Sequence, residues 1–75
     1  MPDNKIARNI RAMRCRRGIT QAELASRAGV SGGHLCECES GKKIPSLKLI
    51  QKLAKALDCR VSELIDGSSD ERSAG

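Results

Sequence analysis

The sequence of 75 residues contains no Phe, Tyr or Trp and a single histidine, His34. Proteins that bind single-stranded RNA or DNA stack the bases on aromatic side chains, so this absence argues against those modules. One His, with no Ser/His/Asp grouping, no phosphate loop and no paired carboxylates at a cleft, offers little support for catalysis. We therefore expect no enzyme, no cofactor and no small-molecule substrate.

The sequence also lacks a hydrophobic run long enough to span a bilayer. The chain shows no signal peptide, which favours a cytoplasmic location and free thiols. Cys36 and Cys38 lie two residues apart in an expected helix and point to different sides, so they do not readily share a metal ion. Cys38 and Cys59 occupy apolar positions, and Cys15 is the fourth cysteine. We expect no metal site, with metal or redox sensing as the minor alternative.

The composition predicts one small folded domain that carries an uneven charge. Hydrophobic residues make up 39% and charged residues 31% of the chain, and the net charge is +5. Residues 1–19 contribute +5, residues 20–59 contribute +2 and residues 60–75 contribute −2. A basic front and an acidic tail fit a polyanion that faces one side of the fold. A helical protein with solvated Lys and Arg side chains explains the charge equally well.

Two short helical patterns meet at a tight turn within residues 20–40. Thr20 and Glu23 form a capping box at the start of the first helix. The helix ends at Gly29, because Gly adopts the left-handed backbone conformation of a helix end at little energetic cost. The apolar face of this helix consists of Leu24, Ala25 and Ala28.

The second helix of the pair is predicted to run from its cap at Ser31 to Ser40. Leu35 and Cys38 share its inner face. Gly32, Gly33, His34, Cys36 and Glu37 then face outward. Two short helices joined by a Gly-containing turn form a helix-turn-helix, in which the second helix is free to lie in a DNA major groove.

Apolar stripes predict three further helices and an all-α architecture. The first covers residues 5–17 and ends at Gly18, and the last covers residues 61–65. A helix over residues 47–57, capped by Ser46, carries the stripe Leu47, Ile50, Leu53, Ala54 and Leu57. We predict one domain over residues 1–66 and a disordered polar tail over residues 67–75.

Residues 6–66 resemble the five-helix DNA-binding domain of the phage-repressor and Cro class, the XRE-type helix-turn-helix family. The resemblance rests on TQAELASRAGVS, the run Glu39 to Lys42, the run Pro45 to Leu47, LAKAL at 53–57 and the run Glu63 to Ile65. These blocks occur in the order and spacing of the family. The resemblance implies a compact, lambda-repressor-like fold with the helix-turn-helix at its second and third helices.

The same resemblance assigns polar residues to the DNA backbone and to the fold. Gln21 matches the family glutamine that hydrogen-bonds a phosphate, a role that the amides of a helix N-terminus also favour. Lys42 and Lys43 fall in the loop that contacts the DNA backbone, and we add Arg11 from the first helix. A surface glutamine and solvated lysines are the alternatives. Arg14 and Glu39 match a structural ion pair between the first and third helices.

The base-reading positions depart from the family pattern. The resemblance places Ser31, Gly32, Gly33, His34, Cys36 and Glu37 in the major groove, where relatives carry Gln, Arg, Asn or Ser. Glycine has no donor for a base edge, but it lets the backbone approach closely. Glu37 can accept from cytosine N4, and His34 can donate to a phosphate or a base. Specificity then also depends on DNA shape.

These observations together predict a non-enzymatic transcriptional regulator that binds double-stranded DNA. Family members of this size bind pseudo-palindromic operators as dimers, so we expect a homodimer. Val61, Leu64 and Ile65 are the expected dimer surface, with core packing as the alternative reading. The alternative function is a protein-interaction module that has kept the fold and lost DNA binding.

Overall fold

The computed structural model describes residues 4–67, and these residues fold into helices joined by short loops. In chain order they are α1 (Lys5–Arg17), α2 (Gln21–Ala28), α3 (Gly32–Ser40), α4 (Leu47–Leu57) and α5 (Val61–Ile65). The predicted five-helix, all-α fold is therefore confirmed. Of the predicted tail, residues 68–75 lie outside the described residues. No described helix has the length and apolar character needed to cross a bilayer.

Local capping chemistry explains where the helices begin. The capping box of α2 forms as predicted: Glu23 N donates to Thr20 Oγ1 at 3.0 Å, and Thr20 N donates to Glu23 Oε1 at 3.3 Å. The side-chain oxygens of Asn4, Ser31 and Ser46 cap α1, α3 and α4 in the same manner, each accepting from a backbone N–H three residues on.

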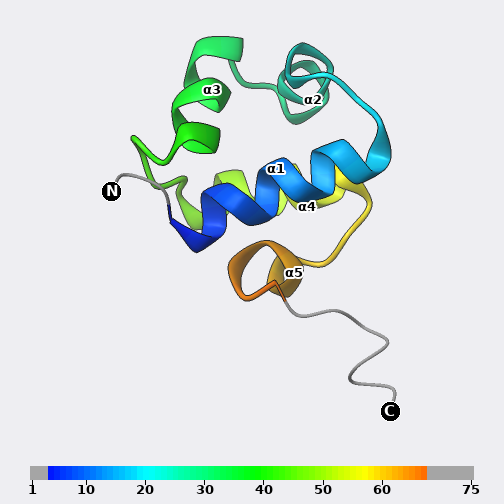
Figure 1. The fold of residues 1–75 in the computed structure, drawn as a ribbon. Coiled ribbons are helices and arrows are strands. Elements are labelled where there is room, and N and C mark those ends of the chain that lie inside the picture. Colours follow the sequence, from blue (N-terminus) through cyan, green and yellow to red (C-terminus); the bar gives the residue numbers. More distant parts are fainter. Residues whose placement is uncertain (1–3, 68–75) are drawn as a thin grey trace.

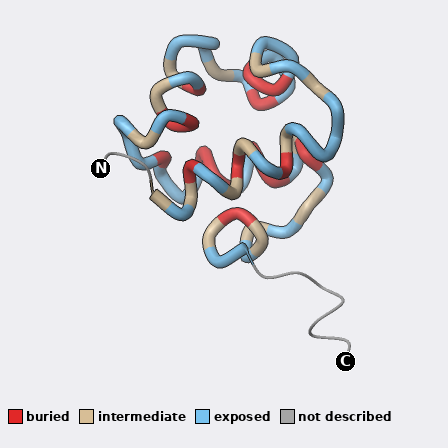
Figure 2. The backbone as a smooth tube through the Cα atoms, viewed as in Figure 1, coloured by how far each residue is buried: buried red, intermediate tan, exposed pale blue. Residues whose placement is uncertain are grey.

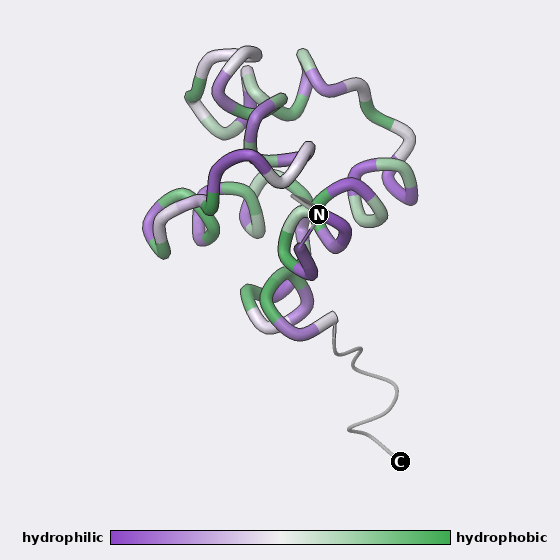
Figure 3. Tube along the Cα trace, turned by 60° about the vertical axis from the view of Figure 1, so that its left-hand side comes forward, coloured by the Kyte–Doolittle hydropathy of each residue, from purple (hydrophilic) through white to green (hydrophobic). Residues whose placement is uncertain are grey.

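The helices surround a core that α1 crosses centrally. In Figure 1, α2 and α3 lie on one side of α1 and α5 on the other, with α4 behind α1. Helix α1 contacts α3, α4 and α5, and α2 packs on α3 and α4. Buried residues face this interior from every helix (Figure 2), and hydrophobic and hydrophilic residues alternate along each one (Figure 3). The fully buried large side chains are Ile10, Leu24, Leu35, Leu53, Leu57 and Leu64.

The predicted apolar stripe of α4 is wrong at its first residue. Leu47 is 59% exposed, whereas Leu49, which was not in the stripe, is buried. Helical spacing does not separate the two leucines, because Leu47 lies three residues before Ile50 and Leu49 lies four residues before Leu53. The packing of α4 against its neighbouring helices buries Leu49 and leaves Leu47, the first residue of the helix, exposed.

Asp58 ends α4 in a conformation that favours glycine. Its φ is 56° and its ψ is 49°, and it has the only positive φ of a residue other than Gly within residues 4–67. Helices α1, α2 and α3 reach the same left-handed conformation with Gly18, Gly29 and Gly41. An L-residue pays a steric penalty there that glycine avoids, and Asp is among the residues that tolerate it best.

We predict that Asp58→Gly raises the free energy of unfolding by about 0.5 kcal/mol, because it relieves this penalty at the cost of some unfolded-chain entropy. The control Asp58→Ala should lower it by about 1 kcal/mol, since Ala lacks the local tolerance of Asp. Urea denaturation followed by circular dichroism measures both. Equal stability of the Gly and Ala variants would contradict this account.

Candidate nucleic-acid interface

The turn between α2 and α3 fixes the two helices against the same core. Gly29 ends α2 with φ 74°, and Val30 N donates to Ala25 O at 3.0 Å. Val30 is half-buried against the core, and Ser31 begins α3 by accepting from His34 N at 3.1 Å. The predicted helix-turn-helix is therefore present.

The outer face of α3 projects away from the core, as the sequence predicted. Leu35 and Cys38 are fully buried on its inner side. The residues expected to face DNA lie on the other side: Ser31, Gly32, Gly33 and Cys36 are exposed, and His34 and Glu37 are half-buried. This side of α3 is open for contact with another molecule.

Neither packing nor backbone conformation requires glycine at 32 and 33. A Cβ atom built at either position would meet nothing within 4 Å, and neither residue has a positive φ. Two glycines near a helix start cost roughly 1 kcal/mol each relative to Ala. The fold therefore gains nothing from these two glycines, and the space in front of them is open.

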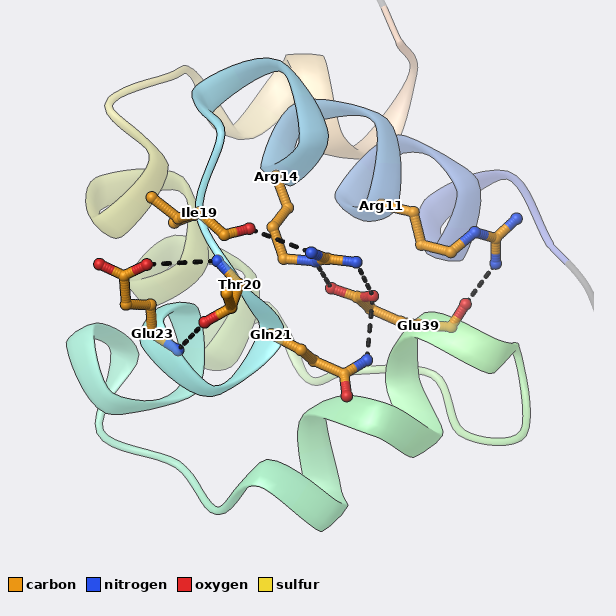
Figure 4. Close-up of polar contacts among 7 residues, drawn as sticks. All are labelled: Arg11, Arg14, Ile19, Thr20, Gln21, Glu23 and Glu39. Carbon is orange, nitrogen blue, oxygen red and sulfur yellow. Dashed lines mark hydrogen bonds and ion pairs between the residues drawn. The ribbon is translucent and has the colours of Figure 1, made fainter.

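A buried carboxylate holds the far end of α3 in place. Glu39 is 2% exposed, and its Oε2 accepts from Arg14 Nε at 2.8 Å. Its Oε1 accepts from Arg14 Nη2 at 3.2 Å and from Gln21 Nε2 at 3.1 Å, so α1 and the start of α2 both bind it (Figure 4). The hydrogen bond to Glu39 raises the pKa of the Arg14 guanidinium above its ordinary value. The predicted contact between Arg14 and Glu39 is present.

Sequence reasoning missed two members of this network. Gln21, predicted to reach a phosphate, directs one amide N–H to Glu39. Arg11, predicted to contact DNA, donates from Nη1 to the carbonyl oxygen of Glu39 (Figure 4). Both contacts join residues far apart in the sequence, so no local sequence pattern predicts them. The amide of Gln21 keeps a second N–H and its oxygen for other partners.

The loop after α3 is tied to Glu37. The backbone N–H groups of Lys42 and Lys43 donate to the Glu37 carbonyl at 3.0 and 3.2 Å. Lys43 Nζ lies 3.8 Å from Glu37 Oε1, with the two side chains 59% and 44% exposed. An ion pair this exposed contributes little to stability, so Lys43 and Glu37 can each leave it to bind another partner. The loop cations thus lie beside the outer face of α3.

The expected dimer surface needs correction at Leu64. This side chain is fully buried in the core of its own chain, so no second copy can reach it. Val61 and Ile65 are half-buried and also pack against the core. The large hydrophobic residues that are exposed within residues 4–67 are Ile44 and Leu47 instead. Sequence reasoning missed Leu47 because it assigned this residue to the apolar stripe of α4.

The four cysteines, all within residues 4–67, form no disulfide. All four are free, and Cys15 and Cys36 are exposed. Burial raises the pKa of the Cys38 and Cys59 thiols, which lowers their reactivity. Among residues 4–67, no three His, Cys, Asp or Glu side chains converge in a way that could hold a metal ion.

We predict that Glu39→Ala lowers the free energy of unfolding by about 3 kcal/mol, because it leaves Arg14 and the Gln21 amide without their buried partner. Lys43→Ala is the matched control. It breaks an exposed pair and should cost less than about 0.5 kcal/mol in urea denaturation.

A double variant, Arg14→Met with Glu39→Met, should recover part of the stability lost by Glu39→Ala, since it removes the uncompensated charge. If Glu39→Ala and Lys43→Ala cost the same, the network does not hold α3.

Comparison with known proteins agrees with this geometry. The family model described as helix-turn-helix matches residues 10–64. An uncharacterised HTH-type transcriptional regulator of Archaeoglobus fulgidus is 37% identical over 62 residues, which span 83% of this chain and 89% of the relative.

Solved structures show the same similarity. The restriction-modification controller protein C.AhdI of Aeromonas hydrophila has a TM-score of 0.77 at 35% identity, over 80% of this chain and 91% of the other. The P22 c2 repressor, solved in complex with a synthetic operator, has a TM-score of 0.79 at 30% identity, over 88% of this chain and 100% of the other. The chain therefore belongs to the helix-turn-helix family of transcriptional regulators, within its phage-repressor and Cro class.

Proposed function

We propose that this protein is a transcriptional regulator that acts in the cytoplasm by binding, without catalysis, to a pseudo-palindromic operator in double-stranded DNA. Residues 31–40 enter the major groove, one copy of the chain in each half-site. The observation that carries the proposal is the outer face of α3, which is exposed, bordered by the cations of the next loop and supported from behind by the Glu39 network.

The DNA backbone binds the groups that flank α3. Lys42 and Lys43 are exposed in the loop and supply positive charge to phosphates. Gln21 donates its remaining amide N–H to a phosphate while the other N–H stays on Glu39. Arg11 acts indirectly, by binding the end of α3 through the Glu39 carbonyl. These contacts position the helix and carry no sequence information.

Base recognition comes from a few side chains of α3 and from the close approach of its backbone to the DNA groove. Gly32 and Gly33 leave the first two residues of α3 without side chains, so the backbone there can lie against the groove floor or wall. Glu37 accepts from cytosine N4 and rejects bases that present acceptors there. His34 and Cys36 complete the exposed set, and DNA shape contributes the rest of the specificity.

Selection from a random duplex library tests the function as a whole. We expect enrichment of a pseudo-palindrome with half-sites about one helical turn apart. Affinity for the selected site should fall with salt, with a log–log slope of about −0.9 per phosphate neutralised. Absence of binding to mixed-sequence duplex at low salt would refute the proposal and leave the protein-interaction module as the remaining function.

Replacing Glu37 by Gln tests base reading. We predict that the preferred base changes at one position in each half-site, by about 1–3 kcal/mol of discrimination, because Gln presents a donor where Glu presents only acceptors. Gln21→Ala is the control, and it should weaken binding to all sequences alike. Selections repeated with each variant measure both, and an unchanged preference in Glu37→Gln would place Glu37 outside the groove.

Ile44 and Leu47 are the exposed apolar residues best placed to contact the second copy. Ile44 lies in the loop after α3 and Leu47 begins α4, at 73% and 59% exposure. We propose that copies on adjacent half-sites bring these segments together. Two side chains cannot provide the roughly 1,000 Å² that a stable interface buries. The homodimer therefore forms on the operator, where DNA supplies the rest of the binding energy.

We predict that the double variant Ile44→Ser, Leu47→Ser binds the full operator about tenfold more weakly, since it removes the apolar contact between copies. Its affinity for a duplex carrying one half-site should equal that of the natural chain. Titrations of both duplexes by fluorescence anisotropy compare the two. Equal weakening on both duplexes, or on neither, would exclude this dimer contact.

A further inference from the structure

A hollow between α2 and α4 has no role in the proposed DNA contacts. Its volume is about 530 Å³, and it lies where the C-terminal end of α2 meets the C-terminal half of α4. Cations and small residues line it: Arg27, Lys52 and Lys55 are the cations, and Ala28, Gly29 and Ala56 are the small residues. No carboxylate is among these lining residues, so the hollow is strongly cationic.

The charges around the hollow are available to a ligand. Lys52 and Lys55 are exposed, and within residues 4–67 neither side chain has a hydrogen-bond or ion-pair partner. Arg27 Nη2 lies 3.6 Å from Glu23 Oε2, but both side chains are more than half exposed and their pairing is weak. An incoming anion can therefore bind these three cations without breaking a stabilising contact.

The floor of the hollow is small and apolar. Ala28 is buried and Ala56 is half-buried. Gly29 adds no side chain, and a Cβ there would meet nothing within 4 Å. The carbonyl end of α2 would repel an anion, but two of its carbonyls already accept from Gly29 N and Val30 N, which reduces that repulsion. The floor thus offers room for an apolar side chain under a cationic rim.

The hollow is separated from the proposed DNA surface. Gln21 begins α2 and the hollow lies at its other end, about 12 Å away along a helix of eight residues. Helix α4, which supplies half of the lining, follows the loop that contains Lys42 and Lys43 and does not take part in the outer face of α3. A ligand in the hollow and a duplex on α3 therefore use different surfaces.

We propose that this hollow binds an acidic peptide segment of a partner protein. Carboxylates of the segment pair with Arg27, Lys52 and Lys55, and one apolar side chain between them rests on the alanine floor. A nucleic-acid backbone would use the cations but has no apolar group for the floor. The chemistry of the lining therefore favours a peptide over a second duplex.

The test uses the full chain and a fluorescein-labelled peptide of Asp and Glu residues with a central Leu. The expected result in an anisotropy titration is saturable binding by the natural chain and a loss of about tenfold or more in the variant Lys52→Glu, Lys55→Glu. The control Lys5→Glu, Arg8→Glu makes the same change in net charge on α1, far from the hollow, and should bind as the natural chain does. Replacing Leu by Gly in the peptide should also weaken binding.

Each remaining outcome overturns the proposal. Absence of binding by the natural chain, or equal losses in the two charge variants, would mean that the hollow recognises no peptide. Circular dichroism confirms that each variant is folded. If Lys52→Glu, Lys55→Glu loses duplex affinity and keeps peptide affinity, the hollow belongs to the DNA surface. Peptide binding does not depend on operator binding, so failure here leaves the proposed function intact.

Discussion

The orientation of α3 depends on one buried carboxylate, that of Glu39. Removing Glu39 from water is costly, and the cost is offset because its oxygens accept from Arg14 and Gln21 at 2.8 to 3.2 Å. These donors come from α1 and from the first residue of α2, and Arg11 adds a bond to the backbone of the same residue. Three helices therefore meet at Glu39, and α3 cannot tilt relative to the other two without breaking this set.

Local chemistry made most of the fold predictable from the sequence. The capping box at Thr20, the caps at Ser31 and Ser46 and the glycines that end the first three helices each act within a few residues of the chain. The outward side of α3 followed from the spacing of Leu35 and Cys38. The contact of Arg14 with Glu39 was available only through the family resemblance, because 25 residues separate the two.

Tertiary packing decided the features that the sequence did not reveal. Leu47 and Leu49 both fit a helical apolar pattern, and only the position of α4 against its neighbours determines which is buried. Leu64 belongs to the core because α5 packs on α1, a contact between opposite ends of the chain. The hollow lined by Arg27, Lys52 and Lys55 joins residues of two helices, so no single segment indicates it.

The glycine pair at the start of α3 has a consequence for how this regulator can change. New side chains at 32 and 33 would extend into empty space, and most would strengthen the helix while leaving the core untouched. Under the proposed function, mutations there would alter operator choice without a penalty in folding. The same property makes this small domain a suitable scaffold for engineering regulators that recognise new DNA sites.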